Sequence, residues 1–345
     1  SIVNRCKPMM YDKLEMSLTG NSLFWPDNWR GSHLIQNISL KAFSVQPTIS
    51  WKISEKLSLG AGLMVDFGSF EMNKGLLPVG SLAQYLPLLP APLQTIINNT
   101  LTISPAGINL AGKSTTGFGF NIGVLYSPTE RLSFGLSYRS KVMMKVEEGE
   151  ASVTYGTTEL QTLLATLAQM SPALAGALGL DGDPFSAELP IPSNLNFGAS
   201  YKVNEDLLVS AELQYVGWKA YDTLSIRFDN VTIATVKNFK NSMIYRVGGE
   251  YSVCENAKIR LGFIYDSTPV DRNLYGPETP GANKISVTAG LTYSPVEMLA
   301  IDFGFQYLNG AKILGRTPQA APLAEFNGEY KSVAYLPSLG FRFNF

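Results

Sequence analysis

The chain is poor in charged residues, cysteine and histidine, and each shortage excludes a class of protein. Asp, Glu, Lys and Arg make up only 16% of the 345 residues, against about 25% in soluble domains. A net charge of −1 provides no basic excess for nucleic acid. Cys6 and Cys254 form no C-x-x-C motif, and His33 is the only histidine. We therefore expect no metal site and no cofactor; whether Cys6 and Cys254 pair stays open.

Long apolar runs are also lacking. Hydrophobic residues reach 45% of the chain, yet no segment approaches the roughly 18 uninterrupted apolar residues of a membrane-spanning helix. A helical membrane protein is excluded. The aromatic content of 11% and the small net charge also argue against a disordered chain.

What the sequence does contain is repeated alternation of apolar and polar residues. Leu132, Phe134, Leu136 and Tyr138, for example, are separated by Ser, Gly and Ser, and this period of two is typical of half-buried β-strands. Twelve segments of this kind, with a partial thirteenth in residues 1–10, are predicted as strands: 14–18, 43–53, 57–67, 118–126, 132–138, 195–203, 207–218, 245–253, 259–265, 285–293, 299–307 and 339–345.

The connections between these segments are alternately short and long. Short polar turns, of which Asp12-Lys13 is the first, alternate with long connections near residues 20–37, 75–115, 149–189, 229–242, 271–282 and 312–329. This arrangement predicts an all-β fold, a transmembrane up-and-down antiparallel β-barrel with short helices in long extracellular loops. A soluble β-sandwich is the alternative, but its core would contain many Gly, Ser and Thr residues. Because a single-chain barrel closes with an even number of strands, we expect at least one strand before Ser1.

Aromatic residues add to the membrane interpretation. They cluster at the short-turn ends of the predicted strands, where an interfacial girdle lies in outer-membrane barrels: Trp51, Tyr126, Tyr201, Tyr251 and Tyr293. The chain also ends on alternating Leu339, Phe341, Phe343 and Phe345, and such an aromatic edge would be an aggregation hazard in a soluble protein.

Three segments resemble the FadL/TodX family of outer-membrane transporters for long-chain fatty acids and other hydrophobic compounds. They are the Tyr-Arg-Ser-Lys-Val of residues 138–142, the Leu-Ser-Leu-Gly-Ala-Gly-Leu of residues 57–63, and residues 266–290 with Ser-Thr-Pro-Val and Pro-Gly-Ala-Asn-Lys. The resemblance covers the whole chain. It implies a monomeric, multi-pass outer-membrane barrel of about 14 strands, of which 12–13 are visible here, in contact with membrane lipid and lipopolysaccharide.

The resemblance also implies a mechanism. In this family an N-terminal hatch with an Asn-Pro-Ala motif fills the lumen, and the barrel wall has a lateral opening for passive transport. The sequence contains no Asn-Pro-Ala, so we expect residues 1–345 to form one barrel domain, N-terminally truncated and without the hatch.

Two apolar insertions are the candidate capture site. In the family the corresponding loops form a groove for the hydrophobic ligand, while the alternative is that the two insertions pack on each other and cap the barrel. The ligand-binding candidates in residues 75–115 and 149–189 are Leu76, Leu77, Leu82, Tyr85, Leu86, Leu160, Leu163, Leu164 and Leu167.

Two lysines are the candidate partners of a carboxylate head group. By local alignment Lys74 and Lys237 match basic positions that line the family's high-affinity pocket. The family position matched by Lys74 carries an arginine, and a lysine replaces its bidentate fork with a point charge. The alternative is that both are ordinary solvated loop lysines.

Other functions find less support in the sequence. Residues 107–114 satisfy the P-loop expression G-x-x-x-x-G-K-[ST], but no helix is predicted after them. An outer-membrane hydrolase would need a catalytic constellation, and no catalytic residue is identified around His33. A general porin or an adhesin remains the main alternative.

Charged residues of inward parity are expected to form a lumenal network: Asp66, Arg139, Glu212, Arg246, Glu250, Lys258, Arg260, Asp302 and Arg342.

Overall fold

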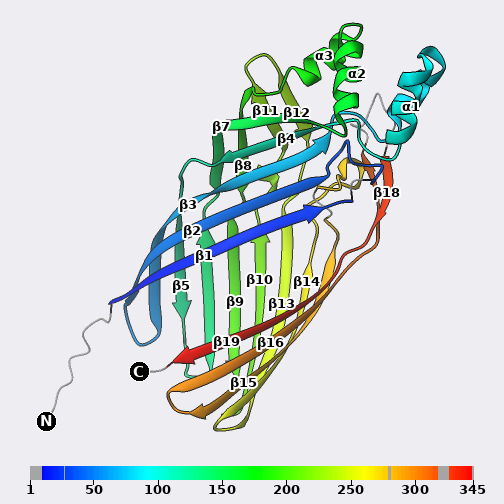
Figure 1. Cartoon of the computed structure of the whole chain (residues 1–345). Helices are drawn as coiled ribbons and strands as arrows, with labels where there is room; N and C mark the ends of the chain where they lie inside the picture. The colour runs from blue at the N-terminus through cyan, green and yellow to red at the C-terminus, as the bar shows by residue number, and fades with distance from the viewer. Residues whose placement is uncertain (1–9, 27, 279–280, 318–325, 344–345) are drawn as a thin grey trace, which may run out of the picture.

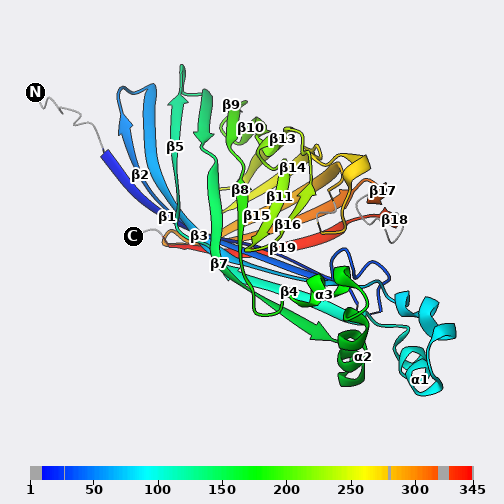
Figure 2. The same cartoon turned by 90° about the horizontal axis from the view of Figure 1, so that it is seen from above.

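The computed structural model describes residues 10–26, 28–278, 281–317 and 326–343. Twelve long antiparallel strands form a curved transmembrane wall (Figures 1 and 2). In order, each strand pairs with the next: β1 (Met10–Phe24), β2 (Asn37–Lys52), β3 (Leu57–Gly75), β5 (Gly117–Tyr126), β6 (Leu132–Arg139), β9 (Asn194–Lys202), β10 (Leu207–Val216), β13 (Ser242–Cys254), β14 (Ala257–Asp266), β15 (Lys284–Val296), β16 (Leu299–Gly310) and β19 (Val333–Phe343).

The twelve strands confirm the predicted barrel architecture, with two differences. The turn expected at Asp12-Lys13 is wrong, because β1 runs through it from Met10. Residues 1–9, which contain Cys6 and all but the last residue of the predicted partial strand, lie outside the described residues. Cys254 is free and exposed.

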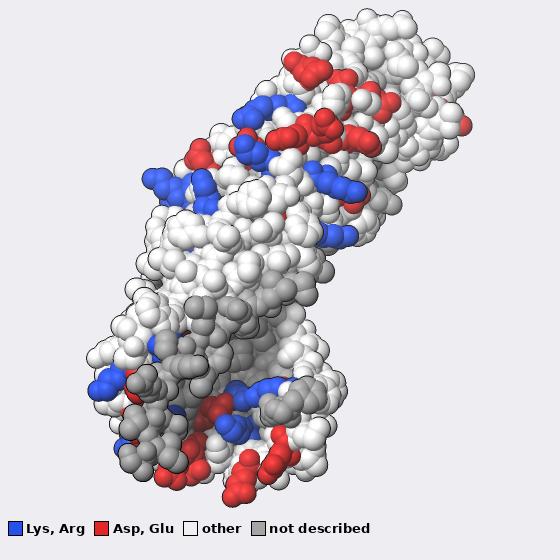
Figure 3. Space-filling model, turned by 90° about the vertical axis from the view of Figure 1, so that its left-hand side faces the viewer, with Lys and Arg blue, Asp and Glu red and all other residues white. Residues whose placement is uncertain are grey.

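The two faces of the wall differ as the alternation predicts. On β3, Leu59 and Leu63 are exposed on the lipid-facing side, whereas Asp66 points inward and is 1% exposed. The aromatic residues expected in the girdle are all exposed as well. On the face seen in Figure 3, a band without blue or red side chains separates charged groups at the lower end of the molecule from charged groups in its upper part. This band fits the hydrocarbon layer of a membrane.

Inward-facing charges form the network that the sequence predicts. Arg246 pairs with Glu212, and Glu250 accepts hydrogen bonds from Lys258 at 3.0 Å and from Arg260 at 2.7 Å. Arg342 reaches Asp302 at 2.9 Å, and Arg139 lies 3.9 Å from Asp66. These contacts offset the cost of removing the charges from bulk water.

A second group of strands continues the wall upward and was not predicted. It comprises β4 (Ala106–Lys113), β7 (Val142–Tyr155), β8 (Pro184–Ile191), β11 (Thr223–Phe228) and β12 (Thr232–Val236). Residues 57–66 of β3 pair with β5, whereas residues 69–75 pair with β4. Because a transmembrane strand needs about 9–11 residues, the upper part of β3 projects beyond the membrane. The P-loop-like residues 107–114 fall mostly within β4, which confirms that they form no P-loop.

The five strands β4, β7, β8, β11 and β12 and the upper part of β3 are here called the extension. The extension encloses an apolar core above the membrane. Leu180 on a loop, Phe185 on β8 and Phe228 on β11 pack with residues of β2, β3, β4 and β7. Burial of this core holds the upper ends of the strands together. Its buried members are Ile35, Ile38, Met72, Ile108, Leu110, Val146, Ala151, Leu180, Phe185, Ala187, Ile226 and Phe228.

Helices occupy the two long insertions, as expected. The first contains η1 (Ser81–Leu88) and α1 (Ala91–Thr100), and the second contains α2 (Thr158–Ala168) and α3 (Pro172–Leu178). Pro172 separates α2 from α3, because proline fits the first turn of a helix and not its interior. Within the described residues no helix has the length and apolar character needed to cross a membrane. Smaller elements are η2 (Trp218–Ala220), η3 (Arg272–Leu274), β17 (Ile313–Thr317) and β18 (Phe326–Tyr330).

Candidate ligand-binding site

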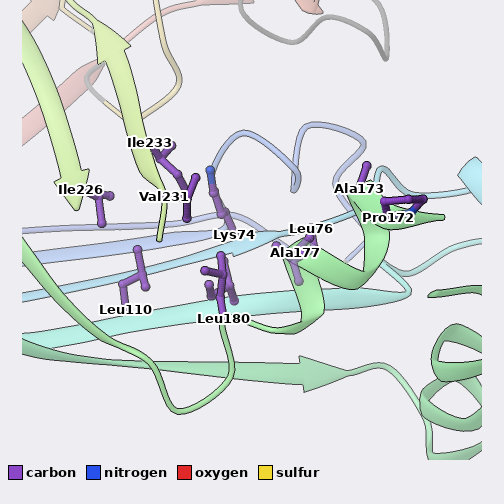
Figure 4. Close-up of a pocket in the computed structure, with 12 residues that line it drawn as sticks. Lys74, Leu76, Leu110, Pro172, Ala173, Ala177, Leu180, Ile226, Val231 and Ile233 are labelled. Atoms are coloured by element: carbon purple, nitrogen blue, oxygen red, sulfur yellow. The ribbon is translucent and has the colours of Figure 1, made fainter. Parts of the chain in front are cut away.

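An apolar cavity of about 350 Å³ lies in the extension, between β3, β4, α3 and the β11–β12 hairpin (Figure 4). This volume is at the lower end of the range for small-molecule sites. Ala173, Gly176 and Ala177 present the small side of α3 to the cavity and leave it open. The other lining residues are Lys74, Leu76, Ile108, Leu110, Pro172, Leu180, Ile226, Val231 and Ile233.

Lys74 is the one charged residue that lines this cavity. It is the penultimate residue of β3, in the part that projects beyond the membrane. Figure 4 shows its side chain crossing the cavity with the nitrogen toward Val231 and Ile233. Among the described residues no carboxylate lies within ion-pair distance of this nitrogen, and burial lowers the pKa of Lys74. A cation among aliphatic side chains matches an amphipathic anion.

Lys237 lies close to Lys74 but is held by a partner. It is 2% exposed and donates to a carboxylate oxygen of Glu278. Its backbone N–H and that of Asn238 both donate to the Asp222 carbonyl, at 2.7 and 2.8 Å. Burial, and to a lesser degree the Lys74 cation, lower the pKa of Lys237 to about 8. The contact with Glu278 therefore helps to keep this ammonium charged.

The predicted loop residues separate into two groups. Leu76 lines the cavity. Leu82, Leu160, Leu163 and Leu164 are buried in a cluster between the two insertions, against which Leu77, Leu86 and Leu167 pack, and Tyr85 is 41% exposed. The insertions do pack on each other. A role of these residues in ligand binding stays a prediction.

Part of the cavity was missed by sequence reasoning. The leucines of α3, Leu174 and Leu178, pack on the helical cluster, whereas the cavity uses the small residues of this helix, none of which was among the candidates. The spacing of Ala173, Gly176 and Ala177 at i, i+3 and i+4 was the available signal. Nothing in the sequence indicated that Ile226, Val231 and Ile233 come from a hairpin that reaches over β4.

The hydrogen-bond ladder of the wall is interrupted beside this region. β5 pairs with β6 only over residues 121–126, and above this level Ser140 N–H donates to the Phe120 carbonyl at 2.9 Å. Farther up, Thr115 N–H donates to the Lys145 carbonyl at 2.7 Å. Between these bonds Gly117 and Gly119 lie against Val142, leaving less than 3 Å between a Cβ at either glycine and the valine methyl groups.

Comparison with known proteins identifies the chain. Residues 17–345 match the model of the outer membrane protein transport protein family (OMPP1/FadL/TodX). The chain belongs to this family. FadL/TodX membership places it in the outer membrane, which it crosses with several strands. The strand series and the uncharged band agree with this location.

Individual FadL/TodX relatives are distant. The chain is 24% identical over 282 residues to "Outer membrane protein P1" of Haemophilus influenzae, covering 79% of this chain and 57% of the relative. It is 22% identical to an Escherichia coli "Long-chain fatty acid transport protein", covering 92% of this chain and 70% of the relative. The chain thus spans little more than half of the first protein's length.

Solved structures confirm the fold. A Pseudomonas aeruginosa FadL homologue superimposes with a TM-score of 0.81 at 22% identity, covering 97% of this chain and 75% of the other. The Pseudomonas putida toluene transporter TodX gives a TM-score of 0.61 at 15% identity, covering 96% of this chain and 78% of the other.

Within the described residues no cluster of three or more His, Cys, Asp or Glu side chains could hold a metal ion.

Proposed function

We propose that the chain carries hydrophobic molecules, with long-chain fatty acids as the favoured class, passively across the outer membrane. The observation that supports this best is the apolar cavity containing the Lys74 ammonium. Its aliphatic wall suits an acyl chain, and the cation suits one carboxylate. The family membership and the printed names of the relatives agree with this substrate class. We assign the chain no catalytic role.

Capture begins at the apolar insertions in this proposal. The exposed Tyr85 and the partly buried Leu77 and Leu86 border the helical cluster, and such apolar surface attracts hydrophobic ligands. Leu76 belongs to the same segment and also lines the cavity, so it connects capture with binding. The buried leucines of α2 hold the helices in place.

Release is proposed to be lateral, through the interrupted ladder between residues 117–120 and 141–144. Fewer backbone hydrogen bonds have to break there than between the neighbouring strands β3 and β5, which pair continuously over residues 57–66. On the inner side of this gap Met64, Val142 and Met144 are buried and apolar, and Phe118 and Phe120 face outward beside it. Apart from the Asp66–Arg139 pair beside Met64, a ligand leaving by this route stays in apolar surroundings.

A deletion tests the capture step. Removing residues 76–97 should lower the uptake of radiolabelled oleate by cells that produce the protein in the outer membrane. Unchanged uptake would contradict loop capture. Liposome swelling with sugars, together with no saturable binding of fatty acid, would instead favour the porin alternative.

A further inference from the structure

The buried ion pair between Lys237 and Glu278 has no assigned role, and it lies near Lys74, whose charge acts on Lys237. The Lys237 side chain is 3% exposed and that of Glu278 is 17% exposed. A buried pair costs desolvation free energy and often adds little stability. Its position next to Lys74 therefore calls for a functional account.

The segment that carries Glu278 is firmly anchored. Tyr275 is 1% exposed and packs with Ile313 and Ala282, and Pro277 is fully buried. Gly276 provides the space into which the Glu278 carboxylate folds back, since a Cβ at this glycine would overlap it. The carboxylate is therefore directed inward by the fold of residues 275–278.

The loop that carries Lys237 is anchored to the same region. Lys240 N–H donates to the Pro269 carbonyl at 2.8 Å, and the Lys240 ammonium lies 3.8 Å from Asp271. Asn238 adopts a left-handed conformation with φ of 46°, which turns the chain between Lys237 and the buried Phe239. The two loops thus hold Lys237 and Glu278 together at fixed positions.

The charges at the site can be summed from these contacts. Lys74 and Lys237 contribute two positive charges and Glu278 one negative charge. Burial lowers the pKa of His33, a backbone hydrogen bond with Arg30 opposes this shift and the Lys74 cation adds to it, and the net lowering favours the neutral imidazole. The Lys240–Asp271 pair is neutral in itself. The sum is one positive charge.

We propose that Glu278 is a specificity-determining residue that limits the site to ligands with a single negative charge. Glu278 occupies Lys237 and leaves Lys74 alone to meet the ligand head group. A monocarboxylate then neutralises the site, whereas a dianion such as an alkyl phosphate leaves an uncompensated charge in an apolar cavity. This inference rests on the proposed function, because it concerns the ligand of the same site.

Substitution of Glu278 tests the inference. In E278Q Lys237 loses the carboxylate that helps to keep it charged, so the test is made at pH 6.5, where protonation of Lys237 is favoured and dodecyl phosphate, with a second pKa near 6, is still mostly a dianion. The site then carries two positive charges, and we expect the affinity for dodecyl phosphate to rise about tenfold relative to dodecanoate. Isothermal titration of the full chain in lipid nanodiscs measures both. The control E329Q removes a carboxylate from the exposed Lys312–Glu329 pair and should leave the ratio unchanged.

A double variant separates charge from folding. K237Q/E278Q restores a single positive charge, on Lys74, and the preference for dodecanoate should return. An unchanged ratio in E278Q, with dodecanoate still bound by the wild type, would overturn the role of Glu278 and leave the proposed function standing. If the wild type binds none of the probes saturably, the proposed function itself fails.

Discussion

Replacing Lys74 by methionine should separate head-group recognition from acyl-chain binding. Methionine has nearly the same length and no charge, so the aliphatic wall of the cavity is kept. The variant loses a charge-assisted hydrogen bond, which contributes about 1.5–3 kcal/mol. Since about 1.4 kcal/mol corresponds to tenfold in affinity, dodecanoate should bind about ten to about a hundred times more weakly. Dodecanol should bind as in the wild type.

The same substitution should act on stability in the opposite direction. Burial lowers the pKa of Lys74, and no carboxylate within the described residues compensates its charge, so the ammonium destabilises the ligand-free extension. We expect K74M to raise the temperature at which the extracellular loops become susceptible to chymotrypsin. K312M, at an exposed ion pair, is the matched control for the loss of one lysine. Equal dodecanoate affinity in K74M and the wild type would refute the assignment of Lys74.

Three further predictions concern other parts of the molecule. Leu164→Ala should destabilise the packing of the two insertions by about 2–4 kcal/mol, seen as faster proteolysis within residues 158–178, while Met170→Ala, at a side chain that is 82% exposed, should not. Gly119→Val places methyl groups against Val142 and Ser140 and should slow oleate uptake without weakening dodecanoate binding, whereas Gly123→Val on the same strand has room and should do neither. In E278Q the gain in dodecyl phosphate affinity should disappear as the pH rises from 6.5 to 9, because the pKa of Lys237, about 8 beside Glu278, is lower still without that carboxylate, so Lys237 is neutral at pH 9; a gain that persists at pH 9 would contradict this.

The wall was predictable because lipid imposes a pattern on every strand. Each membrane-spanning residue of β3 faces either lipid or lumen, so the alternation alone placed Leu59 and Leu63 outside and Asp66 inside. The same logic identified the lumenal charges, which pair as expected.

The extension was not predictable for an equally physical reason. β4 and β11 do alternate, as Ile108 and Leu110 do around Asn109, but they span only eight and six residues and lie within or beside the long connections, so this short alternation did not set them apart from loops. Lys74 and Lys237 were found through the family resemblance. Glu278 was not, because its contact depends on how residues 275–278 fold around Gly276.

The continuous path of β3 makes the bilayer part of the ligand site. This strand has its lower residues in lipid and Lys74 near its upper end, with no flexible linker between them. A thicker or thinner hydrocarbon layer shifts or tilts a spanning strand at a modest cost in free energy. Lipid composition is therefore expected to tune the shape of the cavity, and affinities measured in nanodiscs of different acyl length should differ.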